Sequence, residues 1–277
     1  MATKKTASST RKTVKKPAPS VNKTSTKVTT VKAVPTAATA RAPRFKFSRA
    51  PLLASSVAEF IGTFLLAGVI LVASGQPLFV LFAVLAIVLT IGGVSGAHLN
   101  PVLTLGALAT RRITLIRAVC YIIAQVLGAL MALVIMNAFV NAAPEVSEQA
   151  QAFGQTAPTL FSAPEIEGGK EWTVLTAELL GSVVLAFGVA TALRNRKGSV
   201  AHAFTYAGTV YVAAMIAGTA ANYVGASAVL NPAVAGSLQA IKFELWPILV
   251  YVVTPLVGGV LGFALNDLLR SESEATV

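Results

Sequence analysis

The chain has 277 residues, of which 55% are hydrophobic and 12% are charged, and its mean hydropathy is +0.73. Soluble domains carry about 25% charged residues, so this composition excludes an ordinary soluble protein and indicates a polytopic membrane protein. The formal net charge of +11 comes from the first 50 residues, which contain thirteen Lys or Arg and no Asp or Glu, whereas residues 51–277 contain nine basic and eleven acidic residues.

Residues 1–50 form a tail rich in Lys, Thr, Ala, Ser and Pro, a composition that predicts disorder. The tail lacks the apolar core and cleavage site of a secretory signal peptide, so we expect the first membrane span to direct insertion. Two roles are open for it. It binds anionic lipid headgroups, at about 1 kcal/mol per nearby basic side chain, or it is a solvated segment that only fixes topology. Any contact with nucleic acid would be nonspecific.

Six apolar segments are long enough to cross a bilayer, which takes about 20 residues. They cover residues 52–74, 78–97, 114–140, 172–193, 200–224 and 246–268. The basic residues between spans all fall on the side of the tail: Arg111, Arg112, Arg117, Arg194, Arg196 and Lys197. The acidic loop 143–170 falls on the other side, and residues 269–277 form a C-terminal tail. The positive-inside rule therefore predicts a multi-pass protein of the cell membrane with both termini in the cytoplasm.

An internal repeat divides the membrane part into residues 51–142 and 171–268. The first span contains "AEFIG" (58–62) and the fourth contains the similar "AELLG" (177–181), and "LNPV" (99–102) is matched later by "LNPA" (230–233). Each copy has three spans, an odd number, so the second copy must cross the membrane in the opposite direction to the first.

Each copy also contains a segment that is too short to cross the membrane, at residues 100–109 and 231–240. Asn is a preferred N-cap and Pro a preferred first helical residue, so Asn100-Pro101 and Asn231-Pro232 each predict a helix start. Entering from opposite faces, the two half-helices would meet near the midplane. The fold class predicted is therefore an all-α membrane protein with six transmembrane helices and two re-entrant half-helices.

These motifs resemble the major intrinsic protein family, the aquaporins and aquaglyceroporins. The resemblance covers residues 52–268 and rests on five motifs in the family's order: "AEFIGTF", "SGAHLNPVLTLG", "YIIAQVLGA", "LNPA" and "TPLVGGVLG". It implies a homotetramer with one pore per subunit, which conducts water or small neutral solutes passively through the lipid bilayer.

The pore midplane is predicted to lie at the two half-helix starts, with Val102 and Ala233 next to the two Asn-Pro pairs. Half-helix N-termini carry about half a positive elementary charge each, which disfavours a cation there. The amides of Asn100 and Asn231 can each donate to a water oxygen, which interrupts proton hopping along the file. Both Asn would also serve as N-caps, and the two roles are compatible.

Three further polar residues lie within the predicted membrane region. Glu59 and Glu178 occupy equivalent positions of the repeat. An ionisable group in a span is a functional candidate, so a proton-coupling role is one interpretation. The family resemblance instead implies that both glutamates support the re-entrant loops by buried hydrogen bonds. His98 either braces its loop or faces the lumen.

The sequence departs from the family at the outer constriction. Family members usually carry an Arg directly after the second Asn-Pro-Ala, where this chain has Val234. By family spacing, the other constriction positions are Val80, Thr219 and Ala228. Such a ring would be wider and less polar than a water-only filter, so we expect it to admit larger neutral solutes such as glycerol or urea. Val102 also replaces the usual Ala of the first loop.

Two other classes of function are alternatives to the passive channel. The first is an ion- or proton-coupled transporter, because inverted repeats and broken helices also occur in that class. The second is a membrane anchor for the basic tail. The sequence shows no nucleophile with a base, phosphate-binding loop or metal-ligand cluster, so we expect no enzyme activity, cofactor or metal.

Overall fold

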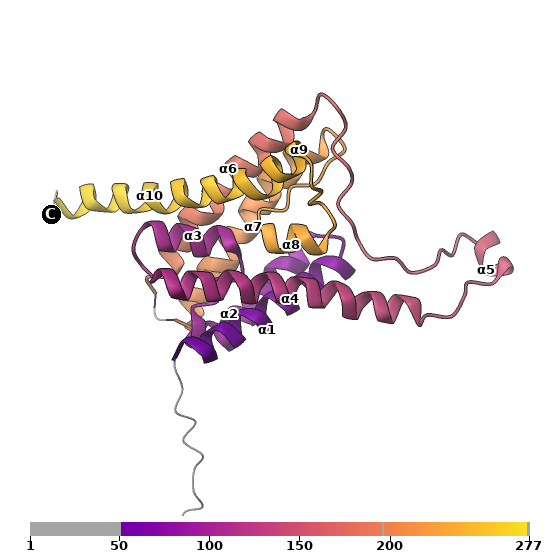
Figure 1. Ribbon diagram of the computed structural model, residues 1–277, viewed down its shortest axis with the longest axis horizontal. Coiled ribbons are helices and arrows are strands. Elements are labelled where there is room, and N and C mark those ends of the chain that lie inside the picture. The colour runs from indigo at the N-terminus through magenta and orange to yellow at the C-terminus, as the bar shows by residue number, and fades with distance from the viewer. Residues whose placement is uncertain (1–50, 196, 276–277) are drawn as a thin grey trace, which may run out of the picture. The chain divides into compact units, whose positions relative to one another are not determined.

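The computed structural model describes residues 51–195 and 197–275, with side chains to residue 270. The predicted N-terminal tail, Arg196 and the last two residues lie outside the described residues. All regular elements of the described part are helical (Figure 1). In chain order they are α1 (Pro51–Val72), α2 (Pro77–Ser95), α3 (Pro101–Ala109), α4 (Leu115–Asn141), α5 (Glu148–Ala152), α6 (Glu171–Ala192), α7 (Val200–Asn222), α8 (Pro232–Ser237), α9 (Leu245–Ile248), the π-helix η1 (Leu249–Val253) and α10 (Thr254–Ala275).

Six helical segments of 19 to 27 residues are long and apolar enough to span a membrane. They are α1, α2, α4, α6, α7 and the continuous stretch Leu245–Arg270, which confirms the six predicted spans. The last span is composite, because η1 separates α9 from α10. Pro255, two residues after the end of η1, has no N–H to donate to the carbonyl of Tyr251, so the regular i to i−4 ladder is interrupted there.

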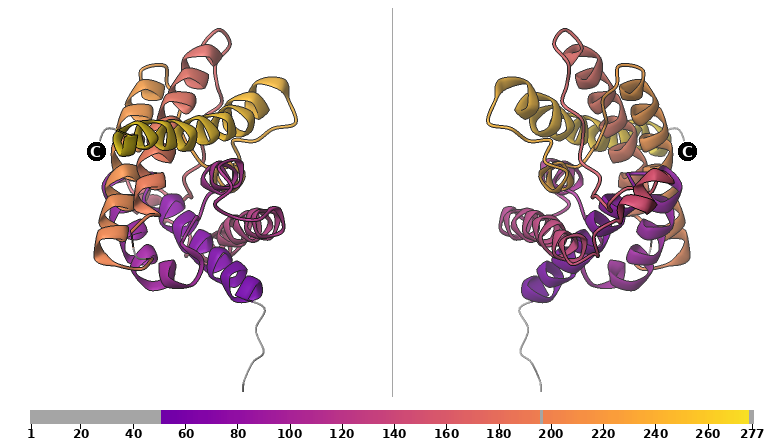
Figure 2. Two further views of the ribbon diagram at one scale, coloured as in Figure 1. Left: turned by 90° about the vertical axis from the view of Figure 1, so that its left-hand side faces the viewer. Right: turned by 90° about the vertical axis from the view of Figure 1, so that its right-hand side faces the viewer.

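The two repeats pack in the same way. In the first, α1 lies against α2 and α4, and in the second, α6 lies against α7 and α10. Contacts between α2 and α7 join the two halves (Figure 2). Close helix approaches are made at glycine. Gly128 of α4 lies on the backbone of Phe60, and Gly258 of α10 lies on that of Leu179, with no room for a side chain at either glycine.

The short helices α3 and α8 lie between α4 and α10, and contact one another (Figure 1). Each begins directly after an Asn whose side-chain oxygen accepts a bond from the helix backbone. Each also ends in the same way, at a left-handed residue, Arg111 (φ 59°) and Gln239 (φ 57°). The next amides, of Arg112 and Ala240, bond back over the last turn at 2.8 and 3.0 Å. This turn makes α8 shorter than the predicted segment 231–240.

Candidate functional site

The two asparagines that cap α3 and α8 are bonded across the centre of the molecule. Asn100 Nδ2 donates to the carbonyl of Leu230 at 2.8 Å, and Asn231 Nδ2 donates to the carbonyl of Leu99 at 2.9 Å. Their Oδ1 atoms accept from the backbone of their own helices, so the direction of each amide is fixed. An amide nitrogen has two N–H groups. Each asparagine therefore holds the opposite loop and keeps a second donor beside that bond.

The residues before each asparagine have an unusual backbone that buried carboxylates hold in place. Leu99 and Leu230 adopt φ of 57° and 58°, a left-handed conformation that leucine rarely takes. Glu59 accepts bonds from the amides of His98 and Leu99 at 2.8 and 2.7 Å. Glu178 accepts from the amides of Val229 and Leu230 at 2.6 and 3.0 Å. Both carboxylates are fully buried.

The first loop has additional side-chain partners. Gln125 Nε2 donates to Glu59 Oε2 and to Thr104 Oγ1, both at 2.9 Å. The hydroxyl of Tyr206 donates to the carbonyl of His98 at 2.6 Å, and the ring of His98 stands edge-on to Tyr121 at 5.4 Å between centroids. His98 Nδ1 lies 3.3 Å from Thr104 Oγ1. Its ring is therefore braced on two sides, and it also lines a cavity described below.

A cavity of about 500 Å³ reaches the two asparagines from the side of the acidic loop. The four positions predicted for the constriction, Val80, Thr219, Ala228 and Val234, all line it together with Asn100 and Asn231. Most of the other lining side chains are apolar: Leu66, Ile70, Val84, Leu103, Leu185, Val210, Met215 and Leu238. Among the described residues that line this cavity, none carries a formal charge.

Four predicted midplane residues are not among those that line the cavity: Pro101, Val102, Pro232 and Ala233. All four are buried in helix packing. Val102 lies against Gly259 of α10, where its carbonyl and side chain occupy the space that a methyl group on that glycine would need. The larger side chain of Val102 is therefore matched by a small residue on the neighbouring helix.

Phe161, which the sequence analysis did not single out, also lines the cavity. It belongs to the long segment between α5 and α6, which folds back on the protein through backbone bonds from Phe161 to Leu71 and from Ala163 to Leu238, both 3.0 Å. Glu165 of this segment pairs with Lys242. The hydrogen bond from Lys242 and its positive charge lower the pKa of Glu165. No local pattern marks Phe161, because its place depends on contacts distant in sequence.

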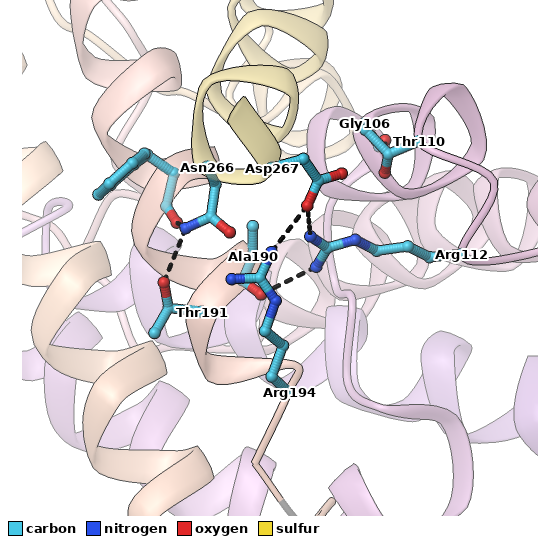
Figure 3. Close-up of polar contacts among 9 residues, drawn as sticks. Gly106, Thr110, Arg112, Ala190, Thr191, Arg194, Asn266 and Asp267 are labelled. Carbon is cyan, nitrogen blue, oxygen red and sulfur yellow. Dashed lines mark hydrogen bonds and ion pairs between the residues drawn. The ribbon is translucent and has the colours of Figure 1, made fainter. Parts of the chain in front are cut away.

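A second cavity, of about 490 Å³, lies on the other side of the asparagines. His98 lines it at its inner end, and most of its other polar lining is basic: Arg112, Arg194, Lys197 and Arg270, with Asp267. Asp267 Oδ1 accepts from Arg112 Nη2 at 2.5 Å and from Arg194 Nη2 at 2.7 Å (Figure 3). The sequence alone marks Arg112, Arg194 and Lys197 only as topology signals, because their clustering with Asp267 requires three separate chain segments to meet.

A family model described as Major intrinsic protein matches residues 46–265. The chain is 31% identical over 226 residues to glycerol uptake facilitator protein-like 6 of Lactiplantibacillus plantarum, covering 78% of this chain and 98% of that protein. It is 31% identical over 184 residues to aquaporin-1 of Sus scrofa, covering 65% and 61% of the two chains. The X-ray structure of the aquaglyceroporin from Plasmodium falciparum has the same fold, with a TM-score of 0.57 and 19% identity over 78% of this chain and 96% of that one.

Proposed function

We propose that this chain, which belongs to the major intrinsic protein family, is a passive transmembrane channel for water and small uncharged solutes such as glycerol or urea. The solutes move along the two cavities and past the asparagines that separate them. The observation that carries this proposal is the pair of cross-bonded amides, Asn100 and Asn231, which line the first cavity and keep donors for a passing oxygen.

The chemistry at the asparagines favours neutral solutes. The N-termini of α3 and α8 meet there and bring partial positive charge, which raises the energy of a cation. A water that accepts hydrogen bonds from both amides has no lone pair left to accept a proton from a neighbouring water, so proton hopping along the file is interrupted. Glu59 and Glu178 fit the role of loop supports, because their oxygens accept bonds from backbone amides. This use argues against a coupling role for either carboxylate.

The wide apolar constriction at Val80, Thr219, Ala228 and Val234 forms the selectivity region of this channel. Its support is the uncharged lining of the first cavity among the described residues. A hydroxyl-bearing solute such as glycerol can place its carbon face on these side chains while its hydroxyls bond to backbone carbonyls and the asparagine amides.

In its membrane setting, the protein is a homotetramer in the cell membrane, with both termini and the Arg112–Asp267 cluster on the cytoplasmic side. The excess of basic residues between spans on that side supports this orientation. The basic tail, which lies outside the described residues, adds attraction to anionic lipid.

Stopped-flow light scattering on proteoliposomes tests the selectivity. The wild type should pass water, glycerol and urea. Val234→Arg should lower glycerol flux relative to water flux by about tenfold, because added side-chain atoms narrow the constriction and discriminate against the larger solute. Val234→Met is the matched control, because it adds length without charge, and it should have a smaller effect. A wild type that excludes both solutes would contradict the wide constriction, and uptake driven by an imposed proton gradient would contradict passive conduction.

A further inference from the structure

The cavity on the cytoplasmic side has a chemistry that the passage of neutral solutes does not require. Among the described residues that line it are four cationic side chains and one carboxylate. The first cavity, on the opposite side of the asparagines, has no charged side chain among its described lining residues. A path for glycerol or urea needs only hydrogen-bonding groups. The charged residues at one end of the path therefore indicate a second role for this cavity.

One cation of the cavity, Arg112, is held in place by the fold. The left-handed turn at Arg111 fixes the backbone of Arg112 at the end of α3. The guanidinium of Arg112 is bonded to the carbonyl of Ala190 at 2.8 Å and to Asp267 (Figure 3), and it stacks over the ring of Phe263 at 5.0 Å. Such a preorganised guanidinium loses little freedom when an anion binds.

The positive charge is only partly neutralised by Asp267. Arg112 and Arg194 share a single oxygen of that carboxylate, Oδ1. A guanidinium has five N–H donors, and the bonds just described use two on Arg112 and one on Arg194. Burial and the charges of Arg112 and Arg270 lower the pKa of Arg194. An anion bound beside these groups would relieve their mutual repulsion.

The cavity lies in series with the solute path. His98 lines it, and the next two residues, Leu99 and Asn100, line the first cavity. Lys197 reaches the same segment, since its Nζ lies 3.6 Å from the point that a Cβ on Gly96 would occupy. Any molecule held among the arginines therefore stands between His98 and the cytoplasmic solution.

We propose that this cavity binds a small phosphate-class anion from the cytoplasmic solution, and that the bound anion lowers solute flux through the same pore. Planar guanidinium groups match phosphate oxygens with paired hydrogen bonds, and a dianion interacts more strongly than a monoanion with several neighbouring cations. Because Ala107 and His98, which line the cavity, are buried inside the helix bundle, the ligand is a free anion rather than a lipid headgroup. The effect on flux rests on the function proposed above, whereas the binding does not.

Binding is tested by calorimetric titration of inorganic phosphate and of pyrophosphate into the full-length protein in detergent. The double variant Arg194→Gln/Lys197→Gln should weaken the Kd at least about tenfold, as expected when charge-assisted bonds are lost. Arg111→Gln is the matched control, because Arg111 is exposed, does not line the cavity, and occupies a left-handed position that Gln239 also adopts. Its Kd should equal that of the wild type. Equal weakening in the control, or equal effects of chloride at matched ionic strength, would overturn the site.

Flux is tested in proteoliposomes of neutral phosphatidylcholine, with phosphate or chloride at matched ionic strength on both sides. Phosphate should lower glycerol flux in the wild type and in Arg111→Gln but not in the double variant. The same result in vesicles that contain phosphatidylglycerol would exclude a lipid headgroup as the ligand, whereas inhibition that appears only with the anionic lipid would overturn the free-anion assignment. Saturated binding without inhibition would overturn the effect on flux. Absence of glycerol and water flux in chloride would instead contradict the channel function, and the titration would still decide the site.

Discussion

The two re-entrant loops of this protein share a backbone but differ in what supports them. In each loop, a left-handed leucine precedes the capping asparagine, a buried carboxylate binds two consecutive amides, and the asparagine donates to the opposite leucine carbonyl. The pair Leu99 and Leu230 shows that this strained conformation is maintained twice by the same means. The repeat therefore preserves the contacts that hold the centre of the pore.

Part of the difference between the loops lies at one position of the repeat. Tyr121 and Tyr251 each donate a hydroxyl to the loop of their own half, at 3.0 and 3.1 Å. Four residues after Tyr121 comes Gln125, which bonds to Glu59, whereas four residues after Tyr251 comes Pro255, next to the π-helix. The first half thus has a glutamine side chain that supports the loop carboxylate, whereas the second half has a proline and a π-helix at the equivalent place. An inverted repeat can keep its central geometry while the outer support of each loop diverges.

The largest expected effect follows from removing the two carboxylates. Glu178→Ala leaves two backbone donors of the second loop without a partner. Glu59→Ala leaves two backbone donors of the first loop and one N–H of Gln125 without a partner. Each buried donor left unpaired costs about 1–3 kcal/mol, so both variants should lose stability and flux, and Glu59→Ala should lose more stability. Thermal unfolding of the purified proteins measures this, with the exposed Glu148→Ala as control. A reversed order would show that Gln125 is not a significant support.

A smaller effect is expected where the two halves pack alike. Gly128→Ala and Gly258→Ala each place a methyl group against the backbone of the neighbouring helix, and such overpacking costs about 1–3 kcal/mol. The two variants should lower the midpoint of thermal unfolding by similar amounts. Gly208→Ala is the matched control, since nothing lies within 4 Å of the added methyl group, and its unfolding midpoint should stay the same or rise. A lower unfolding midpoint for only one of the two variants would show that the two helix contacts are not equivalent.

The smallest effect compares the tyrosine hydroxyls. Tyr121→Phe and Tyr251→Phe each remove one hydrogen bond to a loop carbonyl, worth about 0.5–1.5 kcal/mol. Tyr121→Phe should be the more harmful, because its hydroxyl also lies 3.4 Å from Arg117 Nη1. Thermal unfolding in detergent ranks the pair. Equal or opposite losses would mean that the additional partner on the first loop carries no stability.

The sequence by itself determined the six spans, the inverted repeat and the starts of both half-helices. These features are local or periodic: a run of apolar residues must be helical in lipid because its amides have no other partner, and an Asn-Pro pair favours a helix start wherever it occurs. The equivalence of Glu59 and Glu178 was also visible in the repeated motif.

Only the tertiary structure decided which side chains share a cavity. Val102 follows the first Asn-Pro pair, yet it packs against Gly259, while Phe161 reaches the first cavity from a distant segment. The cluster of Arg112, Arg194 and Asp267 forms because the ends of α3, α6 and α10 converge. The direction of a side chain depends on how helices rotate and pack against one another, and those contacts join residues far apart in the chain, where no local spacing records them.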